Sequence, residues 1–78
     1  MEPAQNLDPE EACLRVLGEA GGETLHWTVV LDRALTRRLI DPFTTPDVRG
    51  QVVKALAALA REGRVDKQGP GLYRARTG

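Results

Sequence analysis

The sequence predicts a small α+β domain, mostly helical, that ends in a β-hairpin. Apolar residues recur at helical spacing in three stretches between residues 8 and 63, each bounded by start and stop signals. Two short alternating stretches follow at once, on either side of Gln68-Gly69-Pro70-Gly71. The 78 residues, 41% of them hydrophobic, suit one modest core.

The first helix is predicted to begin after Asp8. Asp8 is a typical N-cap, Pro9 suits the first helical position, and Glu11 stands three residues after the cap, as a capping box requires. Gly21-Gly22 ends the helix, because glycine adopts the left-handed conformation without strain. The inward stripe of this helix comprises Ala12, Cys13, Val16, Leu17 and Ala20. Residues 1–7 are expected to be a flexible lead-in to a single domain at residues 8–76.

A second helix is predicted from about Trp27 to Arg38, after a short segment at residues 23–26 that suits a brief strand. Arg37 and Arg38 would lie in its last turn, where the helix dipole favours positive charge. The connector from Leu39 to Phe43 is expected to cover the core with its apolar residues. The inward residues of the helix are Trp27, Val30, Leu31, Ala34 and Leu35.

The third helix is predicted to open at Thr45, with Pro46 at its first position and Asp47 next. Gly63 ends it, and residues 64–67 and 72–75 alternate as two strands. Its inward stripe comprises Val48, Val52, Leu56, Leu59 and Ala60. Three helices followed after one glycine by a hairpin indicate a winged helix-turn-helix, three helices plus a C-terminal wing.

Charge is unevenly distributed along the chain. The total is zero, with 11 basic and 11 acidic residues. Residues 49–78 carry seven lysines and arginines against two acids, a net +5, whereas residues 1–23 carry six acids against one base, a net −5. Such a molecule can orient on a polyanion despite its zero net charge.

The basic half supplies candidate contacts to double-stranded DNA. On the third helix, Arg49 and Gln51 suit guanine and adenine edges, and Lys54 suits phosphate. Gly50 would allow close approach of the backbone. The start of this helix would hold a phosphate through hydroxyls and free amides, and the wing would contact the DNA backbone or minor groove. The predicted DNA-binding residues are Thr44, Thr45, Arg49, Gln51, Lys54, Arg64, Lys67, Gln68 and Arg74. Arg61 is a further phosphate candidate.

Catalytic and metal chemistry find little support. Cys13 and His26 provide two of the four ligands of a structural zinc site, and one cysteine excludes an internal disulfide. We interpret Cys13 as a core residue and His26 as a structural or surface residue. No catalytic triad, phosphate-binding glycine loop or carboxylate pair is recognisable. The expectation is therefore a protein that is no enzyme and needs no cofactor, metal or small-molecule substrate.

Neither a signal peptide nor a membrane span is recognisable in the sequence. The expected location is intracellular, the cytoplasm in a bacterium or the nucleus in a eukaryote, with no membrane partner.

Four short segments resemble the HARE-type winged helix. They are Leu25-His26-Trp27, Leu39-Ile40, Thr45-Pro46 and Gly71-Leu72-Tyr73, and the resemblance covers about residues 9–76. That family occurs in chromatin proteins of the additional-sex-combs type, in some restriction endonucleases and in the delta subunit of bacterial RNA polymerase. The resemblance implies a DNA-associated or transcription-associated adaptor.

Two functions follow as hypotheses. The first is a DNA-binding winged helix in transcription regulation or chromatin. The alternative is a protein-interaction adaptor, favoured by the balanced total charge, the acidic first helix and the small surface at Ala55, Ala57 and Ala58. Binding of single-stranded RNA is disfavoured, because the chain has few aromatic residues on which bases would stack.

Overall fold

The computed structural model describes residues 8–76, so the expected lead-in at residues 1–7 lies outside the described residues. The described part confirms the α+β class and the layout of three helices with a C-terminal wing. Its elements are α1 (Pro9–Glu19), β1 (Leu25–His26), α2 (Trp27–Thr36), α3 (Val48–Arg61), β2 (Val65–Gly69) and β3 (Leu72–Ala75).

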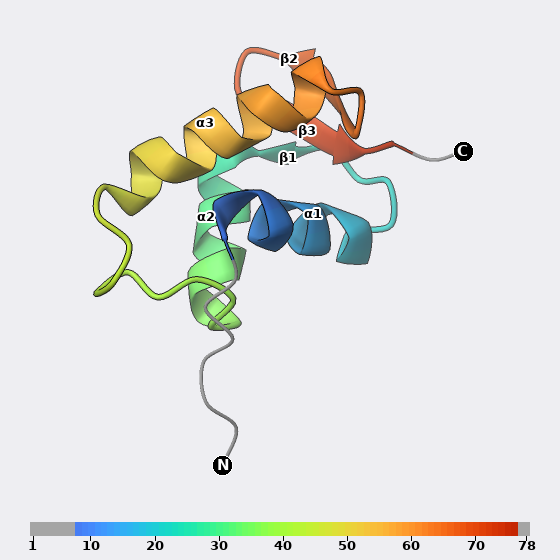
Figure 1. Cartoon of the computed structure of the whole chain (residues 1–78). Helices are drawn as coiled ribbons and strands as arrows, with labels where there is room; N and C mark the ends of the chain where they lie inside the picture. The colour runs from blue at the N-terminus through green and yellow to red at the C-terminus, as the bar shows by residue number, and fades with distance from the viewer. Residues whose placement is uncertain (1–7, 77–78) are drawn as a thin grey trace.

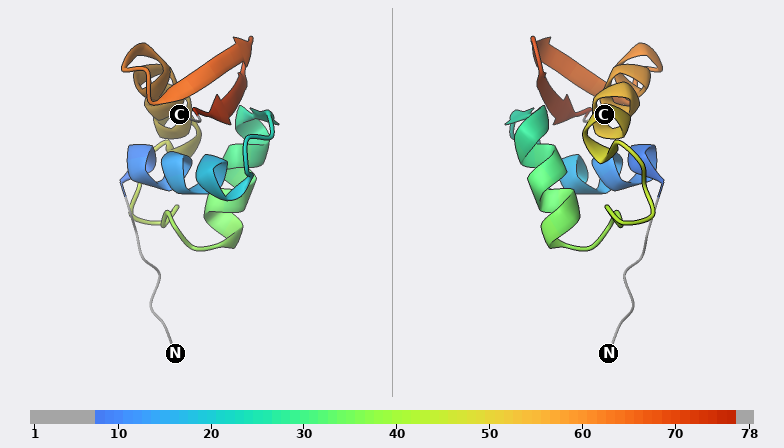
Figure 2. Two further views of the ribbon diagram at one scale, coloured as in Figure 1. Left: turned by 90° about the vertical axis from the view of Figure 1, so that its right-hand side faces the viewer. Right: turned by 90° about the vertical axis from the view of Figure 1, so that its left-hand side faces the viewer.

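Helix α1 packs against both α2 and α3, and the hairpin β2–β3 lies beside the C-terminal half of α3 (Figures 1 and 2). The sheet is antiparallel with the order β1-β3-β2, so β3 is central. Tyr73 stands opposite Leu25 on one side and Lys67 on the other. A register shift between Lys67 and Gly69 leaves Gln68 at a β-bulge. The two-residue β1 thereby ties the wing to the start of α2.

The predicted N-cap and the predicted glycine end of α1 are confirmed. Asp8 Oδ1 accepts hydrogen bonds from the backbone N–H groups of Glu10 at 2.8 Å and Glu11 at 3.2 Å. The helix ends at Glu19, and Gly21 and Gly22 follow with φ of 65° and 92°. A short polar cap and a pair of glycines are therefore sufficient to fix this helix at both ends.

Helix α2 begins at Trp27 as predicted but ends at Thr36, two residues early. Arg37 is its C-cap and Arg38 has a φ of 57°, so neither lies in the last turn as expected. The chain turns after the helix, and the Leu39 N–H closes this turn by donating to the Ala34 carbonyl at 2.9 Å. This left-handed turn at a non-glycine residue gives no sequence signal.

The predicted start of α3 is wrong. The helix begins at Val48, and Asp47 is the N-cap, with its Oδ1 accepting from the Gly50 N–H at 3.3 Å. Thr45 is not the cap because it closes a preceding turn, in which its N–H donates to the Asp41 carbonyl at 3.0 Å. The sequence offers two capping residues two positions apart, and the carboxylate at residue 47 takes the role.

The core of the described residues is entirely apolar. It confirms most of the predicted stripes, adds Ala55, and takes Val65 and Tyr73 from the wing. Cys13 is fully buried, as predicted. The connector behaves differently at its two ends, because Leu39 and Ile40 are buried whereas Phe43 is 96% exposed. The expectation that Phe43 covers the core is wrong: its N–H is tied to Asp41 Oδ1 at 2.9 Å in a turn that presents the ring to solvent.

Candidate nucleic-acid interface

The exposed side of α3 is basic. Its 14 residues contain no acid, and Arg49, Lys54 and Arg61 are exposed. None of these three cations forms an ion pair with any residue in the part of the chain that the structure describes. The apolar stripe through Val52 and Leu59 faces the core, so the exposed face carries these cations together with Val53 and Ala57.

Arg49 is held over an aromatic ring. The carbon of its guanidinium lies 5.6 Å from the centroid of the Trp27 ring, within the range of a cation–π interaction. Trp27 was predicted to face inward. Its side chain packs against the core but is only half-buried, so the prediction is met in part. The two residues are far apart in sequence and share no periodic pattern, which is why the sequence did not predict this pair. Trp27 restricts the positions that Arg49 adopts.

The tip of the wing packs on the same place. The backbone N–H of Trp27 donates to the Gly71 carbonyl at 2.8 Å. Gly71 has a φ of 73°, and a Cβ there would lie 3.0 Å from Trp27 Cδ1 and 3.1 Å from His26 Nε2. The glycine therefore serves the turn, as predicted for this hairpin, and it also allows close packing that the sequence did not predict. The wing tip is thereby fixed beside the start of α2, next to the Trp27 ring that Arg49 contacts.

His26 has the structural role that the sequence favoured. It is the N-cap of α2, where its Nδ1 accepts from the Thr28 N–H at 3.3 Å and lies 2.8 Å from Thr28 Oγ1. These contacts fix its ring beside the wing tip.

A second group of cations meets between α3 and β2. Arg61 and Lys67 line one hollow of about 350 Å³, together with Tyr73 and the small Ala57 and Ala60. No carboxylate lines it, and Lys67 forms no ion pair among the described residues. The structure thus brings a predicted wing residue next to Arg61. A hollow with two cations and no acid suits a phosphate. We call Arg49, Lys54, Arg61 and Lys67 the basic surface.

The remaining wing cations are partly neutralised. Arg74 Nε lies 3.8 Å from Asp66 Oδ2, directly across the β2–β3 pair. Arg64 Nη1 lies 4.0 Å from Glu62 Oε1. Exposed pairs of this kind contribute only about 0–1 kcal/mol, so a phosphate can compete for both arginines. Gln68 is exposed at the bulge.

The predicted phosphate anchor before α3 is not formed as expected. The N–H groups of Thr44 and Thr45 donate to the Asp41 carbonyl at 3.3 and 3.0 Å, so these amides are not free. The Asp47 carboxylate caps the helix, placing negative charge where a phosphate would sit.

The structure gives Gly50 a different role from the close backbone approach to DNA expected from the sequence. A Cβ there would lie 2.8 Å from Asp47 Cγ. The missing side chain therefore makes room for the cap of α3, and this role needs no approaching partner.

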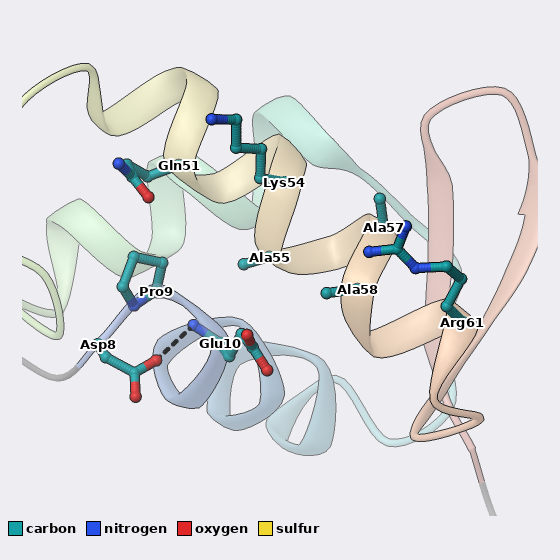
Figure 3. A pocket seen from close by; sticks show the side chains of 9 residues that line it. All are labelled: Asp8, Pro9, Glu10, Gln51, Lys54, Ala55, Ala57, Ala58 and Arg61. Carbon is teal, nitrogen blue, oxygen red and sulfur yellow. Dashed lines mark hydrogen bonds between the residues drawn. The ribbon is translucent and has the colours of Figure 1, made fainter.

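Gln51 lies on the side of α3 that faces α1. A groove of about 440 Å³ runs between the two helices, with Gln51 and Lys54 on α3, Glu10 on α1 and Asp8 at the N-cap of α1 (Figure 3). Figure 3 shows the Lys54 side chain extending away from α1, whereas Glu10 lies across the groove from Ala58. The two carboxylates therefore border the basic surface on this side and disfavour phosphate there.

The lone thiol has little chemical reactivity. Burial raises the pKa of Cys13 from 9.0 to about 12, and the nearby Asp8 and Glu10 carboxylates add to the rise. A thiol that stays neutral is a poor nucleophile and metal ligand. Within residues 8–76, no three His, Cys, Asp or Glu side chains gather as metal ligands would. No helix there is both long and apolar enough to cross a membrane.

Comparison with protein families, with curated proteins and with solved structures gave no significant match.

Proposed function

We propose that this domain binds double-stranded DNA, in transcription regulation or chromatin, with α3 in the major groove and the wing on the backbone. One observation supports it above the others: four exposed cations on α3 and β2, the basic surface, form no ion pair within the described residues. Unpaired cations on the exposed side of one helix and its neighbouring hairpin are the electrostatic pattern of a DNA-binding face. Membership of the HARE-type family is part of the same proposal.

The geometry supports different roles for these cations. Arg49 is restricted by Trp27 and lies near the N-terminus of α3, the part of such a helix that reads base edges. A guanidinium above a ring face still has N–H groups available for guanine O6 and N7. Lys54, Arg61 and Lys67 would bind phosphates on either side of the groove.

Salt dependence of binding tests the proposal. Affinity for a duplex, measured by fluorescence anisotropy, should fall steeply with salt. Lys54→Ala and Lys67→Ala should each reduce the slope of log K against log salt by about 1. Arg37→Ala is the matched control, because Arg37 is exposed but paired with Glu19. Equal effects of all three substitutions, or no binding at low salt, would refute a specific basic surface.

A protein-interaction adaptor is the alternative, and the groove between α1 and α3 favours it. Ala57 and Ala58 line this groove between acidic and basic side chains. Ala55 is only 5% exposed, so it contributes little to the small surface expected from the sequence. Chemical-shift titration with duplex DNA separates the two functions, because DNA binding would move the signals of residues 49–54 and 64–74.

A further inference from the structure

Phe43 is unusually exposed for a large hydrophobic residue. Its side chain is 96% exposed, while Val29 and Val53, the other large hydrophobic residues exposed within residues 8–76, reach 37% and 42%. The exposure is not that of a loose loop. Asp41 holds the turn through its carboxylate, which accepts from the Phe43 N–H at 2.9 Å, and through its carbonyl, which accepts from the Thr45 N–H at 3.0 Å. The backbone that carries the ring is thus held in a defined turn.

A hollow of about 360 Å³ lies beside this ring. Leu35 and Ile40 contribute its apolar wall, and Pro42 and Phe43 border it. Its charged residues are Arg38 and Asp41, one of each sign. An apolar projection and a recess lined by both apolar and charged residues therefore stand next to each other on one molecule, with one charge of each sign. We call these six residues the Phe43 patch.

We propose that the Phe43 patch is a docking surface for a second copy of this chain. A two-fold axis through the patch brings Phe43 of each copy to the recess of the other. The same axis sets Arg38 of one copy against Asp41 of its partner, in both directions. Two-fold interfaces require a surface that complements itself, and a patch with one projection, one recess and one charge of each sign meets that requirement.

The size of the patch sets the strength of the dimer. Six residues supply less than the ~800 Å² per partner of a standard stable interface. The dimer should therefore form weakly and increase with protein concentration. The patch shares no residue with the basic surface, so this inference does not depend on DNA binding.

Sedimentation equilibrium over a range of protein concentrations tests the inference. The weight-average mass of the parent protein should rise towards that of a dimer. Phe43→Ser should weaken association at least about tenfold, because a central aromatic dominates such contacts. Arg38→Glu should also weaken association, since two carboxylates would then face each other. Both arginine and glutamate are non-glycine residues, so the substitution keeps a non-glycine residue at the positive φ of position 38.

Val53→Ser is the matched control, because it removes an exposed hydrophobic residue from α3, and it should leave association unchanged. Circular dichroism checks that each variant is folded. A parent protein that stays monomeric at every concentration overturns the inference. An association that Phe43→Ser leaves intact overturns it too, because the contact would then lie elsewhere.

Discussion

Replacing Gly50 by alanine tests how α3 begins. Helix propensity alone predicts stabilisation of up to about 1 kcal/mol, because glycine is that much less favourable than alanine inside a helix. The structure predicts otherwise. The new Cβ would lie 2.8 Å from Asp47 Cγ, so the carboxylate has to turn away. The N-cap hydrogen bond from the Gly50 N–H to Asp47 Oδ1, 3.3 Å long, is then lost.

The two effects are of similar size. Loss of an N-cap typically costs about 1 kcal/mol, which offsets the gain in propensity. Gly50→Ala should therefore leave the free energy of unfolding unchanged or lower it. The result should reverse in an Asp47→Gly background, where no carboxylate is in the way and glycine suits the φ of 49° at residue 47. There, Gly50→Ala should stabilise by about 1 kcal/mol, raising Tm by roughly 4–8 °C.

Urea unfolding of the four proteins, followed by far-ultraviolet circular dichroism, measures the coupling between the two positions. Asp47→Gly alone should cost only a few tenths of a kcal/mol, because glycine is a tolerated N-cap. If Gly50→Ala stabilises the parent as much as it stabilises the Asp47→Gly protein, the coupling is zero. The assignment of Asp47 as the cap, and of Gly50 as its accommodating residue, would then be wrong.

Three further predictions concern stability, each measured by urea unfolding. Asp8→Ala should lower the free energy of unfolding by about 1 kcal/mol, since Oδ1 accepts two backbone hydrogen bonds. Asp8→Asn should keep most of this stabilisation, because asparagine is also a good N-cap. Equal losses in the two variants would contradict the capping role. Leu56→Ala should cost about 2–5 kcal/mol, because the side chain is fully buried, and a loss below 1 kcal/mol would place it outside the core. Cys13 should make stability fall as pH rises from about 9 towards 12. There the folded thiol, with its raised pKa, keeps a proton that the unfolded thiol has lost; a fall of the same size in Cys13→Ala would assign it to other groups.

The parts of the fold that the sequence predicted correctly are those with local causes. Asp8 and Pro9 define the start of α1 because a cap acts on the next three residues only. Gly63 and Gly71 have positive φ where a helix and a strand reverse direction. The apolar stripe of α3 was predictable because its period of 3.6 residues is imposed by the helix itself.

The errors arise where two local signals compete or where contacts are distant. Thr45 and Asp47 are both good caps, and the choice between them depends on the turn made by Asp41. Periodicity identifies Arg49 and Lys67 as exposed, but says nothing about what lies beside them. The Trp27 ring beneath Arg49 and the Arg61 side chain beside Lys67 come from other elements, and only the assembled fold brings them there.

The position of β3 at the centre of the sheet has a consequence for synthesis of the chain. Leu25 pairs with Tyr73, about 48 residues later, and among the described strands β2 pairs only with β3. Helices α1 and α2 pack against each other and are neighbours in sequence, so they can assemble earlier. The sheet, and with it the hollow that joins Lys67 to Arg61, forms only after residue 75 has left the ribosome. A nascent chain therefore carries α3 without its wing, and gains the complete basic surface in a single late step.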